Sequence, residues 1–113
     1  MKIKNARIKR YEFLAGMYKD GYFPDFLVDK IKHILLDLCE KIEEFSPKTQ
    51  NELLSLTHLA TEGINHLEEK FEENESELET EASEAIGEDF EFIVRAYGFD
   101  SVDIEDVIAS RTW

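Results

Sequence analysis

The chain has 113 residues, 42% of them hydrophobic and 12% aromatic, which is typical of a single packed domain and not of a disordered chain. Its formal net charge of −13 disfavours binding to nucleic acid or to anionic membranes, because such a surface repels phosphate groups. No apolar run approaches the roughly 20 residues that a membrane-spanning helix needs, so we expect one domain over residues 1–113 and no membrane span.

The start of the chain and its cysteine content bear on where the protein acts. The first residues are basic, but the apolar stretch of a secretory signal peptide does not follow them. Cys39 is the one cysteine and therefore cannot form a disulfide within the chain. Both observations predict a cytoplasmic protein.

Apolar residues recur at helical spacing along nearly the whole chain, and this pattern predicts the first two helices. The first is expected over about residues 5–20, with Gly21 as its C-terminal stop. The second is expected over about residues 24–45, where the pair Ser46-Pro47 ends it.

Two capping boxes predict where the next two helices begin. In such a box a Ser or Thr and the Glu three residues later satisfy each other's free backbone donors. Thr49 and Glu52 begin a third helix, which we expect to fray near residue 74. Ser76 and Glu79 begin a fourth helix, which we expect to end just before Gly98.

These elements predict an all-α fold. Each of the four long helices carries one apolar stripe that must be buried against the others, and the connections between them are short. A short fifth helix follows over about residues 102–110. We therefore expect a compact antiparallel helical bundle of four long helices plus a short C-terminal helix.

The charge is distributed unevenly along the chain. Residues 1–32 contain eight Lys or Arg and four Asp or Glu, whereas residues 33–113 contain five basic and twenty-two acidic residues. Between Glu68 and Glu91, twelve carboxylates accompany one lysine. Apolar residues at helical spacing run through this tract, so we expect an ordered hairpin with a solvated acidic face. Six glutamates are candidate contacts for a basic partner protein: Glu69, Glu73, Glu77, Glu81, Glu84 and Glu88.

Asp89 is the exception among the carboxylates of the fourth predicted helix, because it falls within the apolar arc. A buried carboxylate is costly unless it is paired and hydrogen-bonded. We therefore expect it to accept a hydrogen bond from the first or third helix. It is either a structural tie that fixes the register of the bundle or the floor of a small ligand-binding pocket. The candidate donors are Arg7, Tyr11, Tyr18, Thr57 and Thr61, and all but Arg7 are candidate pocket residues beside Asp89.

Carboxylate–histidine pairs one helical turn apart raise the question of a metal site. His58 and Glu62 have this spacing on the third predicted helix, and His66 lies one turn further. Di-iron bundles use Glu-x-x-His motifs on inward faces, and the sequence contains none. These three residues are candidate metal ligands, with chance pairing on a highly charged surface as the alternative.

Other chemical signatures are missing from the sequence. It has no Gly-rich phosphate loop, no His-Glu-x-x-His and no Cys-x-x-Cys. The acidic residues 100–106 lack both the spacing and the glycine of a calcium loop. Cys39 has no histidine one turn away along its helix, which favours a packing role over a nucleophilic one. We therefore expect no cofactor.

Four segments of the sequence resemble a known family: MYKDGYFPDFLVDK, LTHLATEGIN, EAIGEDFEFIVRAYGF and SRTW. They are similar to segments of a family of small acidic bacterial proteins grouped as a domain of unknown function, from Tyr11 to Trp113. The resemblance implies a bacterial, cytoplasmic, helical domain that stands alone. It implies no catalytic residue, because these segments carry no chemical motif.

The acidic tract favours a non-enzymatic interaction protein. Its acidic face on the third and fourth helices would dock a basic protein, as small acidic immunity or antitoxin proteins do. The first alternative is a ligand-binding or catalytic pocket around Asp89, and the second is a metal-responsive protein. A simpler interpretation of the charge is solubility alone. A sealed Asp89 would favour the interaction protein, whereas an open cavity beside it would favour the pocket.

Overall fold

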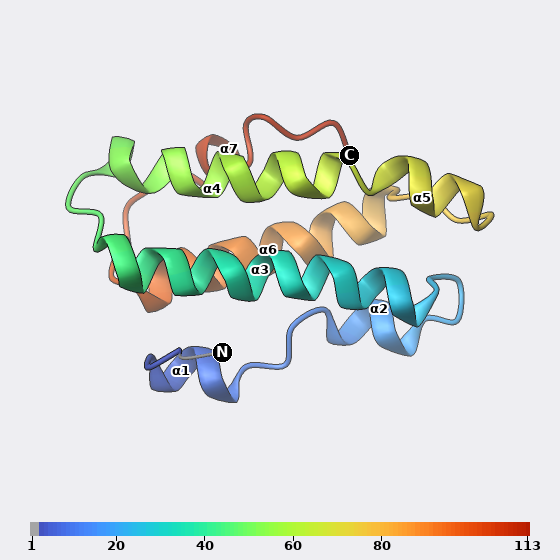
Figure 1. The fold of residues 1–113 in the computed structure, drawn as a ribbon, viewed down its shortest axis with the longest axis horizontal. Helices are drawn as coiled ribbons and strands as arrows, with labels where there is room; N and C mark the ends of the chain where they lie inside the picture. Colours follow the sequence, from blue (N-terminus) through green and yellow to red (C-terminus); the bar gives the residue numbers. More distant parts are fainter. Residues whose placement is uncertain (1–2) are drawn as a thin grey trace.

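The computed structural model describes residues 3–113, and its regular elements are all helices, which confirms the all-α fold class. Three long helices form the body: α3 (Asp25–Phe45), α4 (Gln50–Asn65) and α6 (Thr80–Ala96). Figure 1 shows α4 running antiparallel to both α3 and α6. Four short helices complete the described chain: α1 (Ala6–Arg10), α2 (Ala15–Lys19), α5 (Glu68–Glu73) and α7 (Ile104–Val107).

The core lies where the apolar stripes of the long helices meet. Leu35 of α3, Leu53 of α4 and Phe90 of α6 have no exposed surface, and each lies in a predicted stripe. Full burial of such a side chain contributes roughly 1.5–3 kcal/mol relative to leaving it in water. The packing of these three helices therefore supplies most of the apolar burial that holds the fold together.

Two helix ends adopt the conformations that the sequence predicts. The capping box at the start of α4 is present: the Glu52 N–H donates to the Thr49 hydroxyl, and the Thr49 N–H donates to the Glu52 carboxylate. After α6, Gly98 has a φ of 92°. The N–H of Phe99 then donates to the carbonyl of Val94 at 2.9 Å. This is the hydrogen bond of a Schellman motif, which satisfies a free carbonyl at the helix end.

The sequence predicts one continuous first helix over about residues 5–20, and this prediction is wrong. Its range is divided into α1 and α2, and the chain between them bends at Leu14, which has a φ of 57°. A left-handed residue other than glycine costs roughly 1–2 kcal/mol, so another contact must stabilise it. That contact is the hydrogen bond from the Leu14 N–H to the Asp89 carboxylate.

The boundary between the third and fourth predicted helices is also corrected. α4 ends at Asn65, and α6 begins at Thr80 instead of Ser76. The N–H of Ser76 donates to the carbonyl of Phe71 at 2.8 Å, while Glu75 has a φ of 58°. Ser76 therefore closes the end of α5 instead of beginning α6, and its buried hydroxyl has no hydrogen-bond partner among residues 3–113. The fifth helix is also shorter than expected, since α7 covers only part of residues 102–110.

Residues 108–113 form an irregular segment that side chains fix along α4. The amide of Asn65 donates to the carbonyl of Ser110 at 2.9 Å and accepts from the N–H of Thr112 at 3.0 Å. The Thr112 hydroxyl donates to the carboxylate of Glu68. A single asparagine thus satisfies both a carbonyl and an N–H of this segment, which fixes its position beside the bundle.

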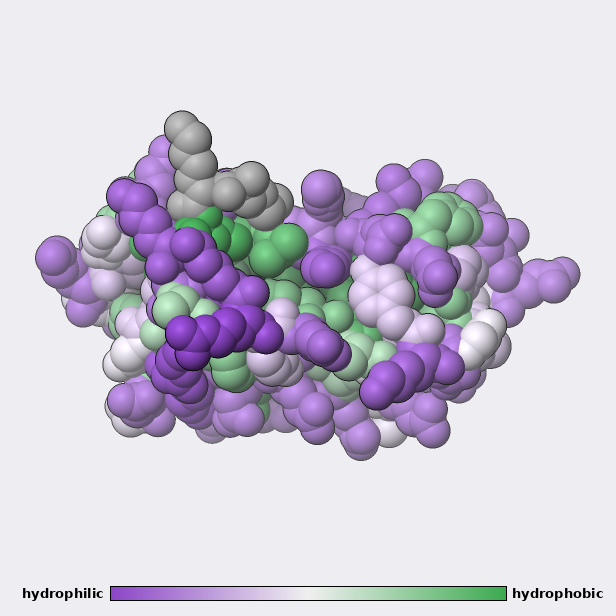
Figure 2. All heavy atoms as spheres, turned by 90° about the horizontal axis from the view of Figure 1, so that it is seen from below, coloured by the Kyte–Doolittle hydropathy of each residue, from purple (hydrophilic) through white to green (hydrophobic). Residues whose placement is uncertain are grey.

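The face of the molecule below α1 and α2 is mainly hydrophilic (Figure 2). Figure 2 shows one face, seen from below relative to Figure 1, on which purple charged side chains surround smaller patches of apolar surface. The described helices include none with the length and apolar character that crossing a membrane would require.

Gly98→Ala should destabilise the protein, because a Cβ in the left-handed region costs roughly 1–2 kcal/mol. Space is not the cause, since a Cβ at this position would meet no atom within 4 Å. Gly16→Ala in α2 is the matched control, because a Cβ there also meets nothing within 4 Å and the backbone is not left-handed. Urea unfolding should show lower stability for Gly98→Ala and unchanged or higher stability for Gly16→Ala. Equal losses in both variants would contradict this account.

Candidate functional site

Asp89 lies inside the protein and receives two hydrogen bonds from the chain between α1 and α2. Its side chain is 4% exposed. The Tyr11 hydroxyl donates to Oδ1 at 2.6 Å, and the Leu14 N–H donates to Oδ2 at 2.8 Å. The expectation that at least one of the five candidate donors bonds to Asp89 is therefore confirmed, by Tyr11, whereas the backbone donor was not expected.

The environment of Asp89 opposes ionisation. Burial raises the pKa of this carboxyl, and the negative charge of Glu88 adds to the effect. The hydrogen bonds from Tyr11 and Leu14 lower the pKa, but they offset only part of the effect of burial. The pKa of Asp89 is therefore about 6 instead of the usual 3.8. At neutral pH the protein therefore holds a buried carboxylate whose charge is stabilised mainly by two donors.

The remaining pocket candidates do not meet Asp89. Tyr18 donates to the Asp29 carboxylate at 2.5 Å. Burial and this hydrogen bond raise the pKa of Tyr18 to about 12. Thr57 and Thr61 are buried, but their hydroxyls donate to backbone carbonyls within α4, at positions 54 and 57. Within this set the structure brings together only Tyr11 and Asp89.

The surroundings of Asp89 are closed by packed side chains. The ring of Tyr11 stacks on the ring of Phe92, with 3.9 Å between the two centroids. The guanidinium of Arg7 also lies over the Phe92 ring, 5.4 Å from its centroid. An open hollow of about 310 Å³ includes Tyr11 and Tyr18 in its lining but not Asp89. Each oxygen accepts one hydrogen bond from the chain between α1 and α2, so this carboxylate is suited to hold that segment against α6.

Glu43 is a second structural carboxylate, and sequence reasoning missed it. It accepts from the Lys4 and Asn5 N–H groups at 2.8 and 3.2 Å and from the Tyr97 hydroxyl at 2.5 Å. Burial alone would raise its pKa, but the three hydrogen bonds lower it overall. The available signal was its place on α3, one helical turn after the buried Cys39.

The candidate metal ligands do not form a site in the described part of the chain. His58 Nε2 lies 2.7 Å from the carbonyl oxygen of Asp106, so that this histidine connects α4 to α7. Glu62 and His66 are exposed near the end of α4. Residues 3–113 contain no group of three or more His, Cys, Asp or Glu side chains that could hold a metal ion.

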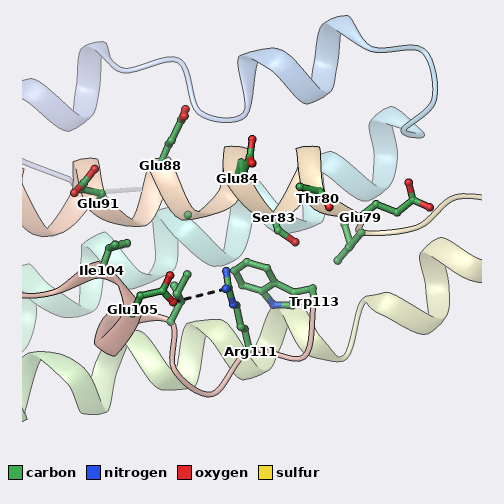
Figure 3. Close-up of a pocket in the computed structure, with 13 residues that line it drawn as sticks. Glu79, Thr80, Ser83, Glu84, Glu88, Glu91, Ile104, Glu105, Arg111 and Trp113 are labelled. Carbon is green, nitrogen blue, oxygen red and sulfur yellow. Dashed lines mark ion pairs between the residues drawn. The ribbon is translucent and has the colours of Figure 1, made fainter.

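The feature that best fits an interaction site is an open groove of about 590 Å³ between α6 and the segment from α7 to Trp113. Figure 3 shows Glu84 and Glu88 of α6 pointing away from Arg111 and Trp113, whereas Arg111 lies beside Glu105 and Trp113. The groove is lined by Leu78, Glu79, Thr80, Ser83, Glu84, Gly87, Glu88, Glu91, Ile104, Glu105, Ile108, Arg111 and Trp113.

The groove combines an acidic rim with apolar surface. Its lining includes five carboxylates and one guanidinium, that of Arg111. This guanidinium lies 3.7 Å from the Glu105 carboxylate and 5.7 Å from the ring centroid of Trp113. Glu91 pairs with Arg95 at 3.3 Å. Glu91 and Glu105 therefore already have cationic partners within the chain.

The six predicted partner-binding glutamates are all exposed, but they do not form one site. Glu84 and Glu88 line the groove. Glu69 and Glu73 lie on α5, and Glu77 lies in the connection to α6. Glu81 lines two other, smaller hollows, one of which is also lined by residues of α2. The acidic face therefore extends beyond the groove.

Comparison with known proteins gives one family and no function. The model of a family of unknown function (DUF5713) matches residues 7–113. No curated protein matches, and no solved structure matches.

Asp89→Asn should change the pH dependence of stability. Because the pKa of Asp89 is raised to about 6 in the folded state, the folded wild type binds more protons than the unfolded chain between about pH 4 and pH 6. Its contribution to stability is thus present at low pH and is lost as pH rises through about 6. Asn cannot ionise, and it can still accept from the Leu14 N–H.

The measurement is the free energy of unfolding of both proteins from about pH 4 to about pH 7.5. The free energy of unfolding of the variant, relative to that of the wild type, should rise by up to roughly 3 kcal/mol across this range. Most of this rise should occur below pH 7. A difference between the two proteins that does not vary with pH would contradict the raised pKa.

Tyr11→Phe should destabilise the protein while keeping the stacking on Phe92. The loss should be about 1.5–3 kcal/mol at neutral pH, where the lost hydrogen bond is made to a charged carboxylate, and smaller at pH 4, where Asp89 is protonated. Tyr22→Phe is the control, because Tyr22 is 46% exposed and its hydroxyl makes no hydrogen bond within the described residues. Thermal unfolding at both pH values would measure this, and equal losses from the two variants would refute the role of Tyr11.

Proposed function

This chain belongs to a family of unknown function (DUF5713), and we propose that it is a non-enzymatic interaction protein that docks a basic protein. The docking surface is the acidic face of α5 and α6, together with the connection between them. Its mode of action would resemble that of small acidic immunity or antitoxin proteins, which cover the basic surface of another protein.

The observation that carries this proposal is a set of unpaired charges on an ordered scaffold. Nine glutamates between positions 69 and 88 are exposed and form no ion pair within the described residues. The helices beneath them are anchored in the core by Phe71 and Phe90, neither of which has exposed surface. Surface charges on a flexible tail would lose entropy on binding, whereas these charges are already positioned.

Repulsion among these glutamates supports the same conclusion. The carboxyl of Glu79 shares a hydrogen bond with Glu77, and this contact, together with the negative charge of Glu77, raises the pKa of Glu79. A carboxylate that retains a proton more readily marks a local excess of negative charge. A cationic partner would relieve this repulsion and would be attracted from a distance.

The interior gives no comparable support to an enzymatic function. The buried carboxyl of Asp89 has both oxygens occupied by donors of the fold. Cys39 is buried, and burial together with the charge of Glu43 raises the pKa of its thiol to about 12, so it is protonated and unreactive at neutral pH. A free, buried thiol is also consistent with action in the reducing cytoplasm.

Affinity purification at two salt concentrations tests the proposal. The tagged protein is incubated with lysate of its source cells at about 50 mM and about 300 mM salt, and retained proteins are identified by mass spectrometry. We expect a basic protein that is retained at low salt and released at high salt. With the purified partner, the association rate constant should fall steeply as salt increases.

Two variants with the same net charge separate the proposed face from charge in general. The first carries Gln at Glu69, Glu73, Glu84 and Glu88, and it should lose the partner. The control neutralises four exposed acids elsewhere, namely Glu12, Glu44, Glu62 and Asp100, and it should retain the partner. Recovery of no basic protein, or equal loss in both variants, would overturn the proposal.

A further inference from the structure

We propose that the groove between α3 and α4 binds the same groove of a second copy of this chain, so that two molecules form a two-fold symmetric dimer. Other residues form this α3–α4 groove than form the acidic face of α5 and α6. The inference therefore goes beyond the proposed function and stands independently of it.

The α3–α4 groove is an open hollow of about 450 Å³ between two helices that run side by side in opposite directions (Figure 1). Ile34 and Leu38 line it from α3, and Leu56 and Ala60 line it from α4. Gly63 of α4 also lies in its wall, where a Cβ would be 3.5 Å from Cδ1 of Ile34. Because position 63 has no side chain, the groove stays open between mainly apolar walls.

Two large apolar side chains are exposed on this face. Leu59 lines the groove and is 61% exposed. Phe45 is 62% exposed and lies one turn after Lys41 on α3, so it extends the apolar stripe of Ile34 and Leu38 past the groove. In a two-fold contact each copy uses the same patch, so a patch that has both an exposed leucine and an adjacent hollow fits itself. Leu59 of each copy then enters the hollow of the other.

The charge of the groove identifies a second copy as the occupant. A two-fold contact places a patch against itself, so a patch with a net charge meets its own sign. The groove beside α6 is lined by five carboxylates and one guanidinium, and two copies would repel each other there. The α3–α4 groove is lined by one aspartate, one lysine and one histidine, so that its acidic and basic side chains balance. On a chain with a net charge of −13, two copies can meet at such a patch without an excess of like charge.

The spacing of Asp37 and Lys41 makes the patch its own electrostatic complement. They lie one turn apart on α3 and form an exposed ion pair at 2.9 Å. When α3 of one copy crosses α3 of the other in the opposite direction, Lys41 of each copy faces Asp37 of the other. Each charge thus has an opposite charge beside it, within its own copy or across the interface, and closing the interface leaves neither unpaired. A purely acidic or purely basic partner would place its own sign against one of the two.

The salt dependence of this dimer is opposite to that of docking a basic protein. Two chains of charge −13 repel each other at a distance, and salt screens this repulsion. The contact between apolar walls does not depend on attraction between net charges. Dimerisation should therefore strengthen as salt increases, whereas a basic partner is released.

Sedimentation equilibrium of the full chain measures the dimer, from about 5 to about 500 µM protein and at about 50 and about 300 mM salt. We expect the average mass to rise from that of a monomer toward that of a dimer, and to do so at lower protein concentration in the higher salt. The amide cross-peaks that shift over the same dilution series should come mainly from residues 33–41 and 56–63.

Leu59→Glu tests the apolar contact. It places a carboxylate opposite each hollow and should leave a monomer at every concentration. Because Leu59 is largely exposed, the core is untouched, and circular dichroism should show unchanged helix content. Tyr22→Glu is the matched control: Tyr22 is also exposed and lies outside the groove, and this variant should still dimerise.

Lys41→Glu tests the balance of charge. It leaves two acids and no lysine in the groove of each copy, so the dissociation constant of the dimer should rise by about tenfold or more. Lys9→Glu changes the net charge equally at an exposed position of α1 outside the groove. At about 300 mM salt this control should change the dissociation constant by less than about twofold.

Three outcomes would overturn the inference. They are a monomer up to the highest concentration in the higher salt, a dimer that survives Leu59→Glu, and equal weakening by each variant and its control. None of them bears on the proposed function, because the acidic face is unchanged in Leu59→Glu and Lys41→Glu. Failure of the affinity purification would likewise leave the dimer intact.

Discussion

The two hydrogen bonds received by Asp89 are the contacts on which the N-terminal part of the fold depends. The Tyr11 hydroxyl and the Leu14 N–H lie on either side of the bend between α1 and α2, and both donate to one carboxylate of α6. Without this acceptor, the buried N–H of Leu14 would lack a partner and its left-handed conformation would lose its compensation. Burial of one charge therefore stabilises a bend that the apolar stripes alone would not form.

Glu43 and Asp89 show two ways of holding the same N-terminal segment. Glu43 has three donors and is partly exposed, so its pKa falls and it stays charged at low cost. Asp89 has two donors and is almost fully buried, so its pKa rises. The first carboxylate orders the segment at its start, through Lys4 and Asn5, and the second orders it after α1. Together they fix both ends of α1, which is too short to be stable alone.

The sequence predicts the parts of this fold that depend on repeated patterns. The stripes of α3 and α6, the Thr49 capping box and the Gly98 cap were predicted because each depends on residues close together in sequence. The break at Leu14 was missed, and so was the left-handed turn at Glu75, after which α6 begins at Thr80 instead of Ser76. Non-glycine residues adopt this conformation only where other contacts compensate. The burial of Asp89 and its need for a hydrogen-bond donor were predicted from its place in a stripe, but the sequence leaves its role open between a structural tie and a pocket floor. The groove beside α6 was not predicted, since its walls join α6 to residues 104–113, part of which Asn65 holds beside the bundle.

The acidic residues of this chain behave differently inside and outside the core. An interior carboxylate is costly by itself, so the fold supplies it with donors, as at Asp89. An exposed glutamate costs little by itself, but nine of them on one ordered hairpin repel one another, and none of the nine forms an ion pair within the described residues. The interior carboxylate thus has hydrogen-bond donors within the molecule, whereas the nine exposed glutamates form no ion pair within the described residues. The exposed face would be stabilised by a second molecule of opposite charge, which is the physical reason for considering it an interaction surface.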